Sequence, residues 1–137
     1  ASVMVGSPLG WFEISELDPK TVAEMKPLVA RWKLERAAMH GGETLPVGSA
    51  PDGRAWTGFA SLAADGRTGY AVLFRELNEK AEFELDFADV FPGVRFAKAE
   101  VIGGRGDVEL DDGTELEVKV PEKLGFVWVR LTSGRQL

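Results

Sequence analysis

The sequence contains no cysteine in 137 residues. A disulfide framework and a metal site built from thiolates are therefore excluded. Histidine is almost as scarce, and His40 has no second imidazole with which to share a metal ion. We therefore interpret His40 as a residue at the negative end of a helix, rather than as a general base or a metal ligand. We expect no metal site, no cofactor and no catalytic residue in this chain.

Long apolar runs are also missing, since no stretch of about 20 apolar residues occurs that could span a bilayer. Basic residues are in the minority, with 16 Lys and Arg against 22 Asp and Glu, which gives a formal charge of −6. An acidic domain repels phosphate, so binding to nucleic acid is disfavoured. The sequence starts at Ala1 without an initiator methionine, and we expect it to be a piece of a longer chain whose compartment is left open.

What is present is enough apolar material for a folded domain. Hydrophobic residues make up 45% of the chain and include four Trp and eight Phe, which can offset the ordering entropy that keeps polar chains unfolded. A length of 137 residues corresponds to one compact unit.

The first third of the chain predicts an amphipathic helix over residues 21–40. Asp18 followed by Pro19 is a typical helix start, and Gly41-Gly42 is a typical helix end. Pro27 is expected to kink the helix or to make it restart. The expected apolar face is formed by Val22, Met25, Leu28, Val29 and Trp32, and the expected polar face by Lys26, Arg31, Lys33, Glu35 and Arg36.

After residue 42 the pattern changes to the two-residue period of β-strands. Residues 80–87 and 114–120 alternate between apolar and charged, which predicts strands with one buried and one solvated face. The predicted strands are 55–62, 70–74, 80–87, 94–102 with a bulge near Lys98, 114–120 and 126–131. Turn signals about a dozen residues apart predict an antiparallel two-sheet β-sandwich of about seven to eight strands, preceded by the helix.

An acidic cluster is the most conspicuous polar feature, and it contains Asp107, Glu109, Asp111 and Asp112. It does not fit a calcium loop of the EF-hand type, because Val118 stands where the terminal glutamate is needed. We interpret the cluster as the water-facing edge of a hairpin and its turn.

Four stretches, taken together, give a resemblance to a known family. They are RWKLER at residues 31–36, GETLPVG at 42–48, PDGRAWTGF at 51–59 and GYAVLFRELN at 69–78. In this order they resemble the end of the α-galactosidase-like (melibiase, clan D) glycoside hydrolases. In that family the last helix of a (β/α)₈ barrel leads into a C-terminal antiparallel β-sandwich.

The resemblance implies that residues 1–42 are the last βα unit of a missing catalytic barrel and that residues 43–137 are the sandwich domain. The catalytic aspartates of the family lie on earlier strands, so this chain is expected to be a non-catalytic accessory domain that packs against the barrel. Sites of such barrels lie at the C-terminal ends of strands. Trp11 and Glu13 are therefore the only predicted sugar contacts, and they would act in the parent enzyme.

Two alternatives stay open from the residues alone. A carbohydrate-binding module would need a planar row of exposed aromatic side chains, to which Trp11, Trp56, Phe59 and Tyr70 could contribute. A protein-interaction module would use an exposed strand edge or a face of the helix.

Overall fold

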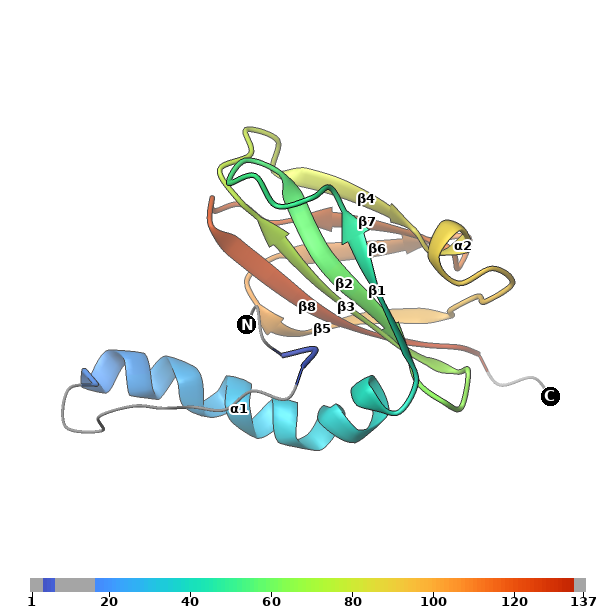
Figure 1. Cartoon of the computed structure of the whole chain (residues 1–137), viewed down its shortest axis with the longest axis horizontal. Coiled ribbons are helices and arrows are strands. Elements are labelled where there is room, and N and C mark those ends of the chain that lie inside the picture. The colour runs from blue at the N-terminus through green and yellow to red at the C-terminus, as the bar shows by residue number, and fades with distance from the viewer. Residues whose placement is uncertain (1–3, 7–16, 135–137) are drawn as a thin grey trace.

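The computed structural model describes residues 4–6 and 17–134, and it shows one long helix lying against a pair of sheets (Figure 1). The long helix α1 comprises Pro19–His40, and a single-turn helix α2 comprises Phe87–Val90. The strands are β1 Glu43–Gly48, β2 Trp56–Leu62, β3 Thr68–Arg75, β4 Glu82–Asp86, β5 Lys98–Gly104, β6 Asp107–Asp111, β7 Glu115–Lys119 and β8 Gly125–Thr132.

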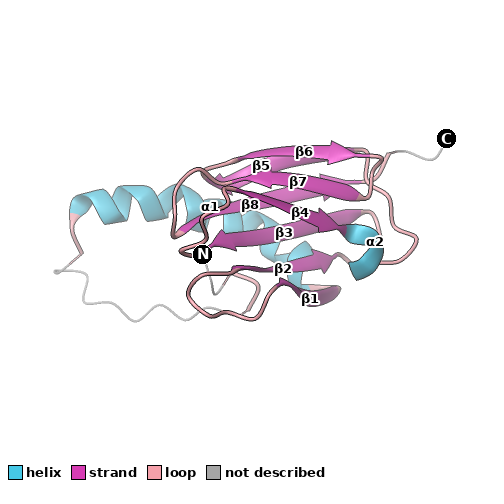
Figure 2. Cartoon of the chain, turned by 90° about the horizontal axis from the view of Figure 1, so that it is seen from above, coloured by secondary structure: helices cyan, strands magenta, loops and turns pink. Residues whose placement is uncertain are grey.

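The strands form two antiparallel sheets that are stacked on one another, as the view from above shows (Figure 2). The larger sheet has five strands in the order β1-β2-β3-β8-β5, and the smaller has three in the order β4-β7-β6. The predicted fold class, a two-sheet sandwich of seven to eight strands after a helix, is therefore confirmed. All six predicted strands are present, and a register shift between Val101 and Gly103 of β5 places the bulge a few residues beyond its predicted position near Lys98.

Two details of the strand prediction were wrong. The edge strand β1 was not predicted, because Pro46 and Gly48 interrupt its short apolar pattern. The predicted strand 80–87 is shorter than expected, since Asp86 accepts a hydrogen bond from the amide of Ala88 and so begins α2. β6 is the hairpin edge that the acidic cluster indicated.

The helix begins where the sequence predicts. The carboxylate of Asp18 accepts hydrogen bonds from the amides of Lys20 and Thr21, which are among the amides that the helix cannot satisfy itself. Of the two outcomes expected at Pro27, a kink or a restart of the helix, the restart is wrong, because α1 runs without interruption from Pro19 to His40. The glycines after the helix also act differently from a left-handed cap. Gly41 has a φ of −79°, whereas a Cβ on Gly42 would lie 1.9 Å from the carbonyl oxygen of Leu62. Gly42 therefore permits the close approach of the helix end to β2.

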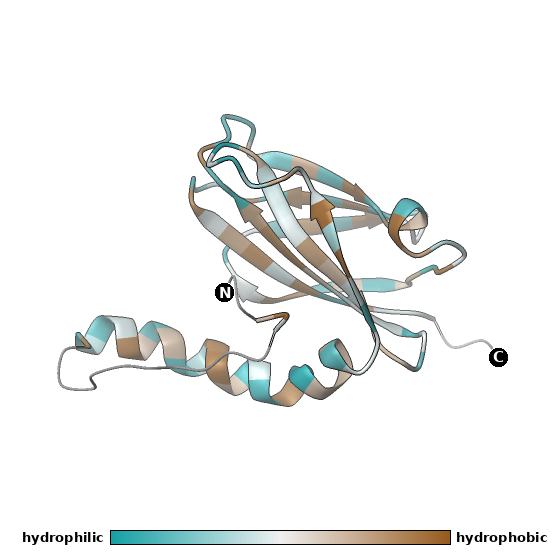
Figure 3. Ribbon diagram, viewed as in Figure 1, coloured by the Kyte–Doolittle hydropathy of each residue, from teal (hydrophilic) through white to brown (hydrophobic). Residues whose placement is uncertain are grey.

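The main core lies between the two sheets. In the three-stranded sheet hydrophobic and hydrophilic residues alternate along the strands, whereas β3 and β8 of the larger sheet are apolar on both faces (Figure 3). The fully buried side chains of this core include Leu73, Phe87, Leu116, Val118, Val120, Val127, Val129 and Leu131. Phe87 of α2 packs edge-on against Phe96 at a ring separation of 5.2 Å and closes one end of the sandwich.

Candidate functional site

A second apolar layer lies on the outer face of the five-stranded sheet, beneath α1. Met39 of α1 packs there against Val72 of β3 and Trp128 of β8, and Met4 joins the same cluster. The carbonyl oxygen of Met4 accepts a hydrogen bond from the indole Nε1 of Trp32 at 2.8 Å. Residues 4–6 are thereby held between the helix and the sheet.

The buried side of α1 differs from the predicted apolar face. Val29 is 41% exposed, whereas Glu35, which the pattern places on the polar face, is 7% exposed. The residues that approach the sheet are Leu28, Trp32, Glu35 and Met39. These positions are spaced by three and four residues, so they form one stripe in which a carboxylate occupies an otherwise apolar position. This carboxylate within an apolar stripe is the only local signal that could have identified Glu35 as a buried residue.

Glu35 is the centre of a buried polar cluster. The hydroxyl of Tyr70 on β3 donates a hydrogen bond to Oε2 of Glu35 at 2.7 Å, and Nη2 of Arg31 lies 2.8 Å from Oε1. The Nε of Arg130 on β8 lies 3.8 Å from Oε2. Burial of the phenol, together with its hydrogen bond to Glu35, raises the pKa of Tyr70 above its usual value. The cluster thus ties the helix to the neighbouring interior strands β3 and β8 of the larger sheet.

An apolar groove of about 670 Å³ opens on the larger sheet beside this layer. Its lining includes Pro46 of β1, Pro51 of the β1–β2 loop, Phe59 of β2, Phe74 of β3, and Leu124 from the turn before β8. Phe74 also packs against the cluster beneath α1, so the groove and the helix–sheet layer form one continuous apolar surface.

Leu124 has an unusual position in this groove. Its side chain is 75% exposed, and its backbone adopts a left-handed conformation with a φ of 60°. Exposure leaves the apolar side chain in water. The left-handed backbone is also unfavourable, because it strains residues that carry a Cβ. The turn therefore presents an apolar side chain to solvent at a cost in stability.

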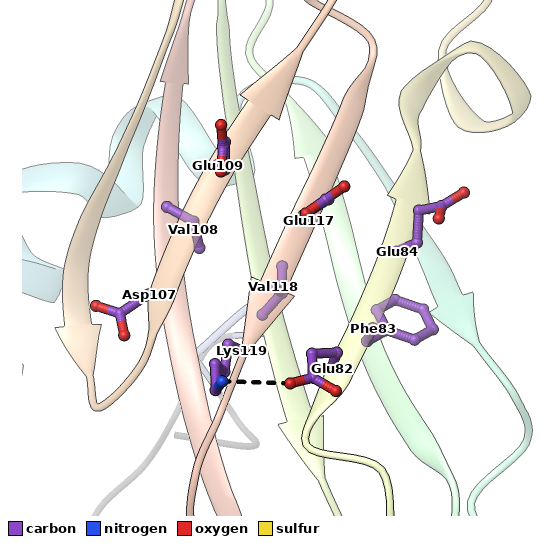
Figure 4. A pocket seen from close by; sticks show the side chains of 9 residues that line it. All are labelled: Glu82, Phe83, Glu84, Asp107, Val108, Glu109, Glu117, Val118 and Lys119. Carbon is purple, nitrogen blue, oxygen red and sulfur yellow. Dashed lines mark ion pairs between the residues drawn. The ribbon is translucent and has the colours of Figure 1, made fainter.

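A second hollow, of about 610 Å³, lies on the outer face of the three-stranded sheet (Figure 4). Carboxylates cover this face in three cross-strand rows. The rows are Glu82, Lys119 and Asp107, then Glu84, Glu117 and Glu109, then Asp86, Glu115 and Asp111. Eight carboxylates against one lysine give a formal charge of −7, more than the −6 of the whole chain. Repulsion from Glu84 raises the pKa of Glu115 above its usual value.

The predicted sugar contacts Trp11 and Glu13 lie outside the described residues. Of the other aromatic residues considered for a carbohydrate-binding row, Trp56 and Tyr70 are buried, with exposed fractions of 5% and 1%. Trp56 stacks on Phe83 at a ring separation of 5.3 Å, and its Nε1 donates to the carbonyl of Lys80. The expectation that these two side chains could form an exposed row is therefore wrong, and of the described candidates only Phe59 reaches a surface groove.

His40 lies at the end of α1, against the N-terminal segment. The Nε2 of His40 lies 3.2 Å from the carbonyl oxygen of Met4, at the end of α1. Over residues 4–6 and 17–134, no group of three or more His, Asp or Glu side chains is arranged to hold a metal ion. In the same part of the chain, neither helix is both long and apolar enough to cross a membrane.

Comparison with known proteins returns no family model and no curated protein sequence that matches this chain.

Proposed function

We propose that this chain is the non-catalytic C-terminal accessory region of an α-galactosidase-like glycoside hydrolase. In this proposal α1 is the last helix of the catalytic barrel, and the β-sandwich is the domain that follows it. The role of the chain is structural: it covers one side of the barrel and fixes the position of the barrel's last helix.

The observation that carries the proposal is where the four family-like stretches meet. The second, third and fourth stretches contribute to the neighbouring strands β1, β2 and β3, and the first lies on α1, which packs on the same sheet. The first supplies Trp32 and Glu35, the second forms β1, the third leads into β2, and the fourth contains Tyr70. The hydrogen bond from Tyr70 joins the first stretch to the fourth. Residues that resemble a family thus include those that set the angle between helix and sandwich.

The incomplete burial of α1 supports a missing neighbour. Glu35 and Met39 are the only buried residues of α1, and both belong to its last two turns. The first half of α1 extends beyond the edge of the sandwich (Figure 1). A helix of this length is normally stabilised by tertiary packing along one face. In the proposal, the rest of the barrel to which α1 belongs supplies that packing.

The carboxylates of the described residues support a role without catalysis. A glycosidase needs two carboxyl groups on either side of the scissile bond. Among the described residues, Glu35 is the only buried carboxylate, and it is already engaged by Tyr70 and Arg31. The acids on the smaller sheet all lie on one open face, so two of them are not placed on opposite sides of a bound sugar (Figure 4).

The experiment extends the reading frame upstream of Ala1 and compares two proteins, the longer polypeptide and the 137-residue chain. We expect the upstream sequence to contain βα units with aspartates at strand ends. We also expect the longer protein to hydrolyse p-nitrophenyl α-galactoside, while the 137-residue chain shows no turnover above buffer. Turnover by the 137-residue chain, or an upstream region without βα units, would refute the proposal.

A further inference from the structure

Buried polar atoms without a hydrogen-bond partner gather in one layer of the described structure. They are Nε of Arg31, Oγ of Ser61, Nε1 of Trp128 and Nε of Arg130. Ser61 and Arg130 are the cross-strand neighbours of Tyr70, and Trp128 belongs to the apolar cluster beneath α1. Arg31 lies on α1 beside Glu35. All four atoms therefore lie between the helix and the outer face of the larger sheet, and none lies in the core between the two sheets.

These unpaired atoms weaken the contact between α1 and the sheet. A buried polar group without a partner costs free energy, and it regains that free energy when it returns to water. Separation of α1 from the sheet hydrates all four atoms, which offsets part of the apolar contact that is lost. The helix–sheet layer is therefore easier to open than the core between the sheets.

Few direct bonds join the helix to the sheet. Among the described residues, the hydroxyl of Tyr70 donates the only hydrogen bond that links the sheet to α1, through Glu35. The carbonyl oxygen of Met4 is bonded to Trp32 and lies 3.2 Å from Nε2 of His40, and both partners belong to the helix. Met4 is thereby tied by hydrogen bonds to α1, and the two form one unit.

The core between the sheets does not need the helix. Its buried and partly buried apolar side chains come from the strands, from α2 and from connecting segments, and α1 contributes none of them. Gly41 and Gly42 join α1 to β1, and glycine accommodates changes of backbone direction that other residues resist. The sandwich therefore keeps its core and its strand pairing when α1 moves away.

We infer that α1 undocks from the larger sheet as one unit while the β-sandwich stays folded. Opening of this kind is a partial unfolding step with a lower free energy than global unfolding. It exposes the side of the sheet that carries Tyr70, Val72 and Trp128. The inference concerns the 137-residue chain by itself and does not rest on the proposed function.

Hydrogen exchange of the native 137-residue chain in low concentrations of urea tests the inference. We expect the amides of residues 32–39 to exchange at least about tenfold faster than the slowest amides of β3 and β8. We also expect them to share one urea dependence that is weaker than that of the strands, since less surface is exposed when only the helix opens. Equal rates and equal urea dependence for helix and strands would overturn the inference. Separate rates for each helix amide, independent of urea, would overturn it as well.

Met39→Ala and Val118→Ala form a matched pair of variants. Met39 is 1% exposed in the helix–sheet layer, and Val118 is 2% exposed in the core between the sheets. Val118→Ala should speed the exchange of the strand amides by about tenfold but leave residues 32–39 unchanged, because Val118 stays buried when α1 opens. Met39→Ala should speed exchange in residues 32–39 by at least about tenfold.

Equal acceleration of the helix and strand amides in Val118→Ala would show that α1 opens only together with the whole molecule, and it would overturn the inference. Val108→Ala gives the same comparison with a smaller loss of stability if Val118→Ala does not fold. Val108 is only partly buried, but it packs against the same core between the sheets.

Discussion

Tyr70 on the larger sheet donates a hydrogen bond to the carboxylate of Glu35 on α1, with an O···O distance of 2.7 Å. Both side chains are almost fully buried, and they lie 35 positions apart in the chain. Apolar packing alone would let the helix rotate or slide on the sheet at modest cost. A buried hydrogen bond between two defined atoms selects one arrangement, because any shift leaves a polar group without its partner.

Tyr70→Phe should lower the free energy of unfolding by about 1.5–3 kcal/mol, since hydrogen bonds to charged groups contribute that much. The ring and its packing are retained, so the loss reports on the hydroxyl. Urea unfolding followed by tryptophan fluorescence measures it. In a Glu35→Gln background the same substitution should cost less, because the acceptor is then uncharged. An equal cost in both backgrounds would show that the two side chains are not coupled.

Tyr70 also predicts the behaviour of the protein in alkali. Burial and the hydrogen bond to Glu35 raise the pKa of this phenol in the folded state above the ordinary value of 10.0. The folded protein therefore holds a proton that the unfolded chain releases. Its contribution to stability is complete below about pH 10 and is lost as the pH rises further.

Tyr70 is the only tyrosine of the chain, so its ultraviolet absorbance reports one group. We expect tyrosinate to appear together with the loss of native tryptophan fluorescence in an alkaline titration. In Tyr70→Phe, the free energy of unfolding should fall less steeply above pH 10 than in the wild type. Reversible ionisation near pH 10 with the native fluorescence intact would contradict this prediction.

The fold could be predicted because its signals are local. The two-residue alternation of Phe83 and Leu85 with their charged neighbours defines a half-buried strand, whatever that strand pairs with. Asp18 and Pro19 likewise define a helix start without help from the rest of the chain. The predicted sandwich followed from several such local patterns in sequence.

The carboxylate rows and the buried cluster around Glu35 could not be predicted from the sequence, because they depend on which strands and which helix lie side by side. Alternation predicts that Glu84 and Glu117 face water, and the acidic cluster predicts that Glu109 lies on a water-facing hairpin edge. Only the order β4-β7-β6 brings the three into one row. Similarly, the burial of Glu35 depends on Tyr70, which belongs to a strand that the helix pattern does not contain. Trp11 and Glu13, which the resemblance selected, lie outside the described residues and stay predictions.

Arg75 holds one end of the sandwich together through its guanidinium group. Nε donates to the carbonyl of Asn78 at 2.9 Å, and Nη1 donates to the carbonyls of Val120 and Pro121 at 2.9 and 2.8 Å. Nη2 donates to the carbonyl of Glu79 at 3.2 Å. The side chain thereby joins the loop before β4 to the segment after β7, and it is 5% exposed.

Arg75→Lys should lower the free energy of unfolding by about 2–4 kcal/mol, although it keeps the charge. A lysine has a single nitrogen and lacks the planar fork, so buried carbonyls are left without donors, each at about 1–3 kcal/mol. Arg67→Lys is the control, because Arg67 is exposed on the β2–β3 turn and should change stability by less than about 0.5 kcal/mol. Equal effects of the two substitutions in urea unfolding would contradict the structural role of Arg75.

The carboxylates on the outer face of the three-stranded sheet predict that the protein is more stable with fewer negative charges there. Glu117 lies between Glu84 and Glu109 in the middle row, so like charges face each other across both strand pairs. Repulsion between carboxylates, above all from Glu84, also raises the pKa of Glu115. A carboxyl group whose pKa is higher in the folded state contributes stability below the ordinary value near 4.5, and this contribution is lost as the pH rises through the raised pKa.

Glu117→Lys should therefore raise the free energy of unfolding at neutral pH by about 0.5–1 kcal/mol, because it converts two repulsive cross-strand pairs into attractive ones. Glu117→Gln should give a smaller increase, since it removes the repulsion without adding attraction. Both increases should shrink in about 1 M salt, where the screening length falls to about 3 Å. Thermal unfolding at low and high salt measures these differences. A destabilised Glu117→Lys protein, or a gain that salt does not reduce, would show that repulsion across these rows does not limit the stability of the smaller sheet.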